Sequence, residues 1–354
     1  MGLGKAHDPK ELHLIAEESN GTYSSITEDL NSKILEAFAV CLAGLKSVVA
    51  VETCITVKTS STIATVNIKS IDWGSSCKRG SSNVVLELGV LYAGEVKDLM
   101  VHIDFTVPEM KGFRSIDLLT ATVNYKDVQR MEPQKTECPL KVNICATSFA
   151  EDCRHESTPF PMVMHQRARS NVLKFFIDQF KAELELLKVG RTGPKAVGKL
   201  HMLWEKFKAN DSDWQKAQEI GDDYLLERID DDINAMVSCL TRGSGPGCVY
   251  SWMLSYEKQR AAFTGLPAAT FLTPAMKEMV QEAQDQAAAT EVDATTSSAV
   301  AAGSTHLAPP GTRLVEALEE IVMGVLERSG GGGAVPSPNS AGTATYAPPS
   351  IGQF

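Results

Sequence analysis

The stretch that decides the first fold element is residues 7–45, HDPKELHLIAEESNGTYSSITEDLNSKILEAFAVCLAGL. Its pattern predicts a helix, a short strand and a second helix. Asp8 and Pro9 form a helix start, with Asp8 as N-cap and Pro9 in the first turn. Asn20 and Gly21 end that helix, where a positive φ is tolerated. The apolar residues expected on its buried face are Leu12, Ile15 and Ala16.

The strand is residues 22–26, and Thr27 is expected to cap the second helix. That helix carries apolar residues every three or four positions: Leu30, Ile34, Phe38, Leu42 and Leu45. Gly2, Leu3 and Gly4 fit the end of a strand that runs into a loop. Such an α/β unit needs a parallel sheet, and only about one and a half strands are present. We therefore expect an incomplete layer that is weakly protected and self-associates through its exposed strand edge.

This stretch also carries a family resemblance. The segments GLGKAHDPKELHLIAEESNGTYSSI (residues 2–26) and FAVCLAGL (residues 38–45) resemble the last part of a von Willebrand factor A (vWA) domain. More narrowly, they are similar to plant proteins that join a RING finger, a vWA domain and a β-plus-helical region, among them the WAVY GROWTH-type E3 ubiquitin ligases. The resemblance extends to about residue 285 and implies a truncated vWA remnant over residues 1–46.

The resemblance brings no site residue with it. In that family the metal-ion-dependent adhesion site begins with Asp-x-Ser-x-Ser on the first vWA strand, and the RING lies earlier still. Both would precede Met1, so we expect neither in this chain. The family's β region is sometimes called intein-like, but splicing needs a terminal His-Asn pair, and no His-Asn occurs here.

Composition narrows the function classes. The chain has 354 residues, a net charge of −10 and a pI near 5.3, which argues against binding nucleic acid or an anionic membrane. No apolar run is long enough to span a membrane, and the N-terminus does not resemble a signal peptide. Eight cysteines occur without any CxxC motif, which is typical of reduced thiols. We expect a cytoplasmic protein, with the nucleus as the alternative.

Between residues 47 and 150 the apolar period changes from 3.6 to 2. Strands are expected near residues 49–57, 64–68, 84–88, 99–107, 119–125 and 140–146, and residues 72–83 are expected to be a polar loop. Six or more strands at this spacing predict an antiparallel β-sandwich.

The helical period returns in residues 162–287. Apolar stripes at 172–187, 197–207 and 214–240, a helix at 250–263, and a short helix from Pro274 to about Gln286 predict a bundle or array of helical hairpins. Together these regions give a multidomain α+β protein: a vWA remnant, a β-sandwich and a helical domain.

The remaining residues, 288–354, read as a low-complexity tail. Its Ala, Thr and Ser residues bury too little surface to fold. One amphipathic helix, residues 313–328, interrupts it and would either dock onto the folded body or bind a partner groove.

The sequence motifs that could form a functional site match their consensus patterns poorly. The segment Gly2-Leu3-Gly4-Lys5 departs from a phosphate loop, because Ala6 follows Lys5. The pair His7-Asp8 is better explained as a helix start than as an acid–base pair. The nearest zinc set is Cys138, Cys145, Cys153 and His155, with spacings of seven, eight and two residues. Structural zinc sites pair ligands about two to four residues apart.

Two further candidates are acidic or basic surface groups. Asp222-Asp223 and Asp230-Asp231-Asp232 are expected to form a solvated acidic face, because consecutive helix residues point in different directions. His102 is expected at the surface of a sheet. No serine lies in a GxSxG motif. We therefore name no catalytic, cofactor-binding or metal residue.

The sequence predicts a non-enzymatic intracellular interaction protein. By resemblance, it would be the partner-binding part of a vWA–RING ligase without its RING, and its protein partners would include ubiquitination substrates of a full-length relative. Two alternatives stay open: a fragment of an active E3 ligase whose upstream part is missing, and a hydrolase whose site is assembled from distant residues.

Overall fold

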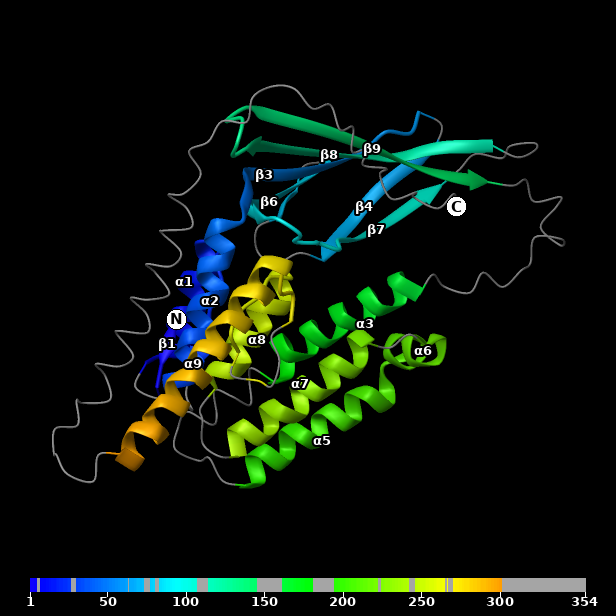
Figure 1. The fold of residues 1–354 in the computed structure, drawn as a ribbon. Helices are drawn as coiled ribbons and strands as arrows, with labels where there is room; N and C mark the ends of the chain where they lie inside the picture. Colours follow the sequence, from blue (N-terminus) through cyan, green and yellow to red (C-terminus); the bar gives the residue numbers. More distant parts are fainter. Residues whose placement is uncertain are drawn as a thin grey trace, which may run out of the picture. The chain divides into compact units, whose positions relative to one another are not determined.

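The structure is a computed structural model, and it mixes helices and strands (Figure 1). It describes the whole chain except residues 5–6, 27–29, 63, 73–76, 80–82, 107–113, 145–160, 181–193, 222–223, 242–245, 265, 267–269 and 301–354. Residues 1–281 form one compact unit and residues 282–354 a second. The predicted helix 313–328 lies outside the described residues.

The first elements are those the sequence predicts. Strands β1 (Gly2–Leu3) and β2 (Ser25–Ile26) pair in parallel, with α1 (Pro9–Glu18) between them and α2 (Leu30–Lys46) after them. The side chain of Asp8 accepts hydrogen bonds from the amides of Lys10 and Glu11, so the predicted N-cap is confirmed. Asn20 has a φ of 54°, as expected where α1 ends. The predicted cap Thr27 lies outside the described residues.

The buried faces of these two helices differ from the prediction. On α1, Ile15 is 62% exposed, and His13 is buried together with Ala16 because this face packs against α8 (Gly247–Lys258). On α2, Phe38 and Leu45 are exposed. The buried positions of α2 are mostly small: Ile34, Leu35, Ala37, Ala39, Val40 and Ala43. Small side chains let neighbouring elements approach closely, so the elements that pack against α2 decide which of its faces is covered.

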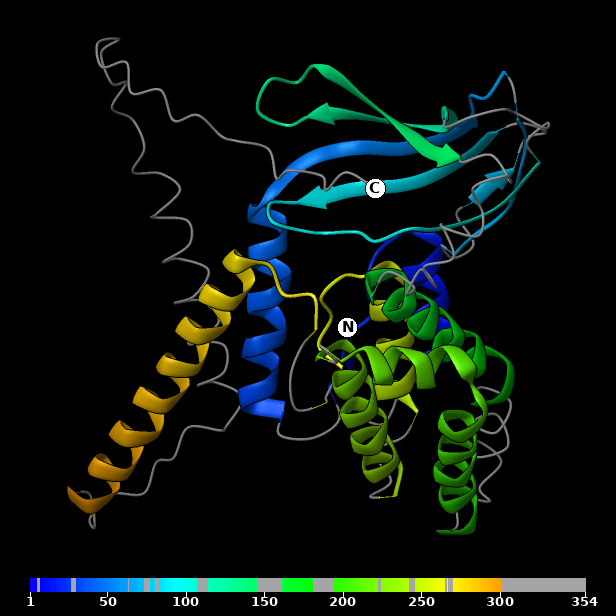
Figure 2. The same cartoon turned by 90° about the vertical axis from the view of Figure 1, so that its right-hand side faces the viewer.

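The β region consists of antiparallel pairs, as the alternating pattern predicts. A five-stranded sheet has the order β5-β6-β3-β8-β9, and β4 pairs with β7 (Figure 2). The strands are β3 (Val48–Thr59), β4 (Thr65–Asp72), β5 (Cys77–Arg79), β6 (Asn83–Tyr92), β7 (Met100–Thr106), β8 (Arg114–Asp127) and β9 (Pro133–Ile144).

Both sheets contribute to one hydrophobic core. Its buried members come from β3, β4, β6 and β8 and from the residue just before β4: Val57, Ala64, Ile71, Val84, Leu86, Leu88, Ile116, Leu118 and Leu119. The expected polar loop at residues 72–83 contains β5, because its short run pairs with the edge of β6. Strand β6 also continues through Gly89 to Tyr92, beyond the strand expected near residues 84–88.

The helical region has more elements than the sequence suggests. They are α3 (Pro161–Phe175), the π-helical turn η2 (Phe176–Phe180), α5 (Pro194–Asn210), α6 (Ser212–Ile220), α7 (Tyr224–Thr241), α8 and α9 (Pro274–Val300). The expected single stripe at 214–240 is two helices, because Gly221 has a φ of 75° and ends α6.

The ends of two helices also differ from the prediction. Helix α8 stops at Lys258 rather than Phe263, since Gln259 takes a left-handed conformation. Helix α9 continues to Val300, so residues 288–300 are helical and not an unfolded tail. Alanine is the best helix former, and the run of alanines at residues 287–289 favours continuation of α9.

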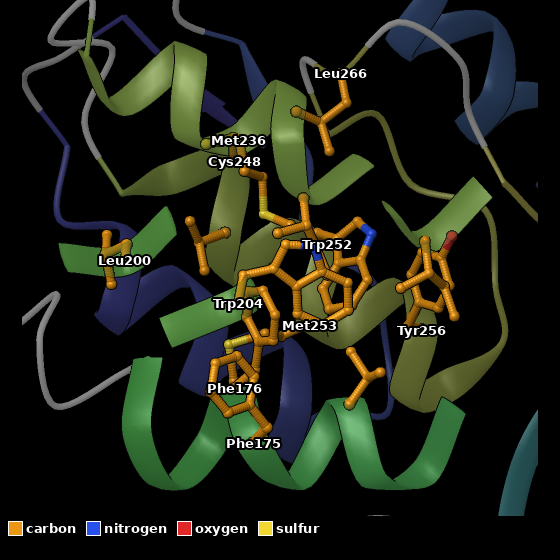
Figure 3. Close-up of a cluster of buried hydrophobic side chains, with 14 of the residues drawn as sticks. Phe175, Phe176, Leu200, Trp204, Met236, Cys248, Trp252, Met253, Tyr256 and Leu266 are labelled. Atoms are coloured by element: carbon orange, nitrogen blue, oxygen red, sulfur yellow. The ribbon is translucent and has the colours of Figure 1, made fainter. Parts of the chain in front are cut away.

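Aromatic side chains fill the core of the helical region. Trp204, Trp214 and Trp252 are each at most 1% exposed. Figure 3 shows Trp204 and Trp252 close to Phe175 and Phe176, and the rings of Phe176 and Trp252 lie 4.9 Å apart. Such ring pairs add to the free energy gained from area burial.

Candidate functional site

A buried ionic cluster forms where three distant segments of the chain meet. We call it the Arg260 joint: Asn20, Glu95, Lys97, Gln259 and Arg260. The Arg260 guanidinium donates from Nε to Glu95 Oε1 at 2.8 Å and also to the carbonyl of Val90. The side chains of Arg260 and Glu95 are only 7% and 2% exposed. Breaking a buried pair of this kind leaves an uncompensated charge, which is strongly destabilising.

Lys97 extends the joint to the end of α8. Its Nζ donates to Glu95 Oε1 and to the carbonyl oxygens of Lys258 and Gln259, at 2.7 and 3.0 Å for the two carbonyls. Gln259 and Asp98 exchange two hydrogen bonds, both 2.7 Å long. The β region is therefore tied to the end of α8 by both charge and backbone contacts.

The joint shifts the pKa values of its members. Burial alone would raise the pKa of Glu95, but the hydrogen bond from Arg260 and the charge of Lys97 hold it below its usual range. Burial, and then the nearby charge of Arg260, lower the pKa of Lys97 to about 8. The carboxylate thus stays ionised, while the ammonium group loses its proton more readily than an exposed lysine does.

The turn after α1 reaches the same place. Asn20 Nδ2 donates to the carbonyl of Leu88 at 2.7 Å, and the carbonyl of Asn20 accepts from Arg260 at 3.5 Å. Gly89 has a φ of 72°, and a Cβ atom there would lie 2.8 Å from Asn20 Nδ2. Glycine at this position therefore permits the close approach of the first α/β element to β6.

The outer edge of β2 is covered by the chain itself. The Ser25 amide donates to the carbonyl of Phe263 at 2.9 Å, and the Phe263 amide donates to Ser24 Oγ at 3.0 Å. Ser251 Oγ on α8 donates to the carbonyl of Tyr23 at 2.5 Å and also lies 3.2 Å from the carbonyl of Phe263. The strand expected to be exposed is buried, with Ser25 2% and Ile26 1% accessible. The predicted self-association would therefore require this edge to open first.

A second polar cluster joins β4 and β7 to α3. Asp72 Oδ2 accepts from Ser170 Oγ at 2.6 Å and lies 3.0 Å from His102 Nε2, while Lys174 lies 3.6 Å from Oδ1. Burial pushes the pKa of Asp72 up, but the hydrogen bonds from Ser170 and His102 hold it below its ordinary value.

The geometry of this second cluster is that of a tether. A catalytic relay places the histidine between the hydroxyl and the acid. Here the serine and the histidine both bind one oxygen of the acid. His102 is half-exposed, near the surface as predicted, but its partner Asp72 was missed, because pairing between β4 and β7 is not visible in the sequence.

The predicted acidic face is wrong for Asp232, which is 2% exposed. It accepts from Trp252 Nε1 at 3.0 Å and from the Tyr256 hydroxyl at 2.9 Å. Asp230 instead accepts from Trp204 Nε1 at 2.7 Å. These carboxylates do not converge on one point, as expected, and burial raises the pKa of Asp232. Asp222 and Asp223 lie outside the described residues.

The other sequence candidates are placed as follows. Gly4 has a φ of 66° directly after β1, which fits a strand end. His7 Nε2 lies 2.8 Å from the Tyr23 hydroxyl, a contact that the helix-start interpretation did not include. Cys138 is exposed on β9, and Cys145, Cys153 and His155 lie outside the described residues.

Two surveys cover only the described part of the chain. There, no three His, Cys, Asp or Glu residues are grouped as a metal ion would require. Within the same residues, none of the helices has the length and apolar character needed to cross a bilayer.

Comparisons with known proteins add little. No protein-family model matches the chain, and no curated protein matches it. Among solved structures, the chain is similar to the crystal structure of the ArnB paralog VWA2 from Sulfolobus acidocaldarius, at 12% identity and a TM-score of 0.29. The match covers 70% of this chain and 55% of that one, so the chain spans about half the length of the protein it matches. A likeness at this level carries no argument about function.

Proposed function

We propose that the chain is a non-enzymatic, intracellular protein-interaction module, similar to the partner-binding part of plant vWA–RING ubiquitin ligases. The first α/β element would present the binding surface. Its partners would be proteins, among them ubiquitination substrates of a full-length relative.

The observation that carries this proposal is where the exposed apolar side chains lie. Of the sixteen large apolar side chains that are exposed among the described residues, seven fall in residues 1–49: Met1, Leu3, Leu14, Ile15, Phe38, Leu45 and Val49. Single exposed apolar residues are normal, and contiguous ones mark a binding surface, so the proposal is that those on α1 and α2 form one surface.

The buried joint supports the same function. Arg260 contacts Asn20 at the end of α1 as well as Glu95, and Lys97 holds the end of α8, so we expect the element to be held in one arrangement before a partner arrives. A preorganised surface loses less conformational entropy on binding, so more of the contact energy contributes to affinity.

The test compares charge placed on this surface with charge placed elsewhere. Ile15→Lys combined with Leu45→Lys should abolish co-purification of the proteins bound by the wild-type chain, measured by quantitative mass spectrometry. Met202→Lys on α5, where Met202 is 60% exposed, is the matched control and should keep them. A partner set that survives the double variant would contradict the proposal.

A ubiquitin-transfer assay addresses the E3 alternative. The purified chain, incubated with activating enzyme, conjugating enzyme, ubiquitin and ATP, should form no ubiquitin conjugates. Conjugates that depend on this chain would overturn the non-enzymatic proposal.

A further inference from the structure

The outer edge of β2 is the place where a parallel sheet of this kind would accept another strand. An open strand edge is a template for pairing with another chain, and proteins cover such edges or disrupt them. Here the cover comes from the same polypeptide, more than 230 residues further along. Ser25 and Phe263 share a backbone hydrogen bond, and Phe263 also donates to Ser24 Oγ at 3.0 Å.

The covering segment is anchored before and beneath its contact with β2. At its start, Gln259 turns out of α8 in a left-handed conformation, and Arg260 inserts into the ionic cluster with Glu95. Beneath it, Ser251 of α8 bridges the carbonyl oxygens of Tyr23 and Phe263. Residues 261–264 are buried, with exposures between 1% and 7%.

We infer that residues 259–264 are a strap that closes the outer edge of β2 and prevents two copies of this chain from pairing through it. The charge of Arg260 holds the strap in place, in addition to the contacts that the strap makes with α8. Arg260 is the anchor, because its guanidinium binds Glu95 on one side and the carbonyl oxygens of Val90 and Asn20 on the other. The inference does not rest on the proposed function.

The experiment uses the full chain and two measurements, amide hydrogen exchange at Ser25 and sedimentation velocity over a concentration series. Arg260→Met keeps much of the side-chain volume and removes the anchor. The Ser25 amide should then exchange at least about tenfold faster, because losing a buried partner shifts the local opening equilibrium by that order. The sedimentation coefficient should also rise with concentration more than it does for the wild type.

Lys69→Met is the matched control. It removes a cation of similar size whose ion pair with Asp104 is more than half exposed and therefore contributes little. Exchange at Ser25 and the sedimentation behaviour should both match the wild type. A control that behaves like Arg260→Met would contradict a specific role for the strap.

A second variant guards against misfolding of the first. Ser251→Ala removes the hydroxyl that bridges Tyr23 and Phe263 and leaves every charge in place. It should give the same two effects at smaller size. The inference fails if the Ser25 amide is unprotected in the wild type. It also fails if that amide is released in both variants without any gain in self-association.

Discussion

Two buried tryptophans differ in one respect, the partner of the indole N–H. Trp252 and Trp214 are each 1% exposed, but Trp252 Nε1 donates to Asp232 at 3.0 Å, whereas Trp214 Nε1 is buried without a hydrogen-bond partner. Removing a donor that has a partner leaves the buried acceptor unsatisfied, which costs free energy. Removing an N–H that has no partner leaves no other group unsatisfied. The two positions therefore separate packing from hydrogen bonding.

Replacing each tryptophan by phenylalanine gives a matched prediction. Trp252→Phe should lower the free energy of unfolding by about 1–3 kcal/mol more than Trp214→Phe, since only the first leaves the buried Asp232 short of a donor. Urea unfolding followed by far-ultraviolet circular dichroism measures the difference. Equal losses in the two variants would show that the Trp252–Asp232 hydrogen bond adds nothing.

The lowered pKa of Lys97 leads us to expect an unusual dependence of the free energy of unfolding on alkaline pH. Its pKa is about 8 in the folded chain and 10.5 when unperturbed, so between these values the unfolded state holds a proton that the folded state has lost. The free energy of unfolding should therefore rise from about pH 8 towards pH 10.

Buried tyrosines reverse that trend. Burial raises the pKa of Tyr23 from 10.0 to about 12, so over this range the folded state holds the proton and stability falls as the pH increases. Urea midpoints measured from pH 7 to pH 11 should pass through a maximum near about pH 10. In Lys97→Met the rise should be absent and the fall should remain. A rise that persists in the variant would assign it to another group.

At the scale of single elements, two glycines with opposite roles can be compared. Gly221 ends α6 with φ 75° and ψ −175°, a region that only glycine adopts readily. Gly198 lies inside α5, and a Cβ atom there would meet no atom within 4 Å.

The same substitution should therefore act in opposite directions. Gly221→Ala should destabilise the chain by about 1–3 kcal/mol. Gly198→Ala should stabilise it by about 0.5–1 kcal/mol, because alanine loses less backbone entropy in a helix. Thermal unfolding of both variants checks the signs. A neutral Gly221→Ala would mean that the break between α6 and α7 needs no glycine.

Helix α2 shows why sequence periodicity predicts an element better than the face that element buries. The pattern of Leu30, Phe38 and Leu45 correctly indicates a helix over this stretch. Yet Ala37 and Ala39 are fully buried, and Leu45 is 70% exposed. The covered face is set by what packs on it: Val40 and Ala43 contact Ala261 and Met276, more than 200 residues away.

At the scale of the whole molecule, residues 1–281 form a single unit, and ionic contacts are among those that link its distant segments. The Arg260 joint links residues separated by 165 positions for the Arg260–Glu95 pair and by 240 for Arg260–Asn20. We expect the β core and the helical core to unfold together, because losing either one removes a partner from the joint.

Leu118→Ala tests this cooperativity. Leu118 is fully buried in the β core, so the substitution should cost about 2–5 kcal/mol. Three of the four tryptophans, Trp204, Trp214 and Trp252, lie in the helical core, so in a Trp73→Phe background fluorescence reports the unfolding of that core. The fluorescence transition should move to lower urea together with the circular dichroism transition. A fluorescence midpoint that does not move would show two independently unfolding units.

The sequence by itself determined the local elements. Asp8 before Pro9 fixed the start of α1, Asn20 fixed its end, and alternation of apolar residues placed β3, β6 and β8. These features depend on backbone preferences and on periodicity, which act over a few residues.

Only the tertiary structure decided the rest: the strap over β2, the buried position of Asp232 and the pairing of Asp72 with His102 and Ser170. Each depends on contacts between segments far apart in the chain. A carboxylate on a helix reads the same in the sequence whether water or a tryptophan N–H solvates it. The free energy of a carboxylate depends most on whether it is buried, and burial is a property of the folded molecule.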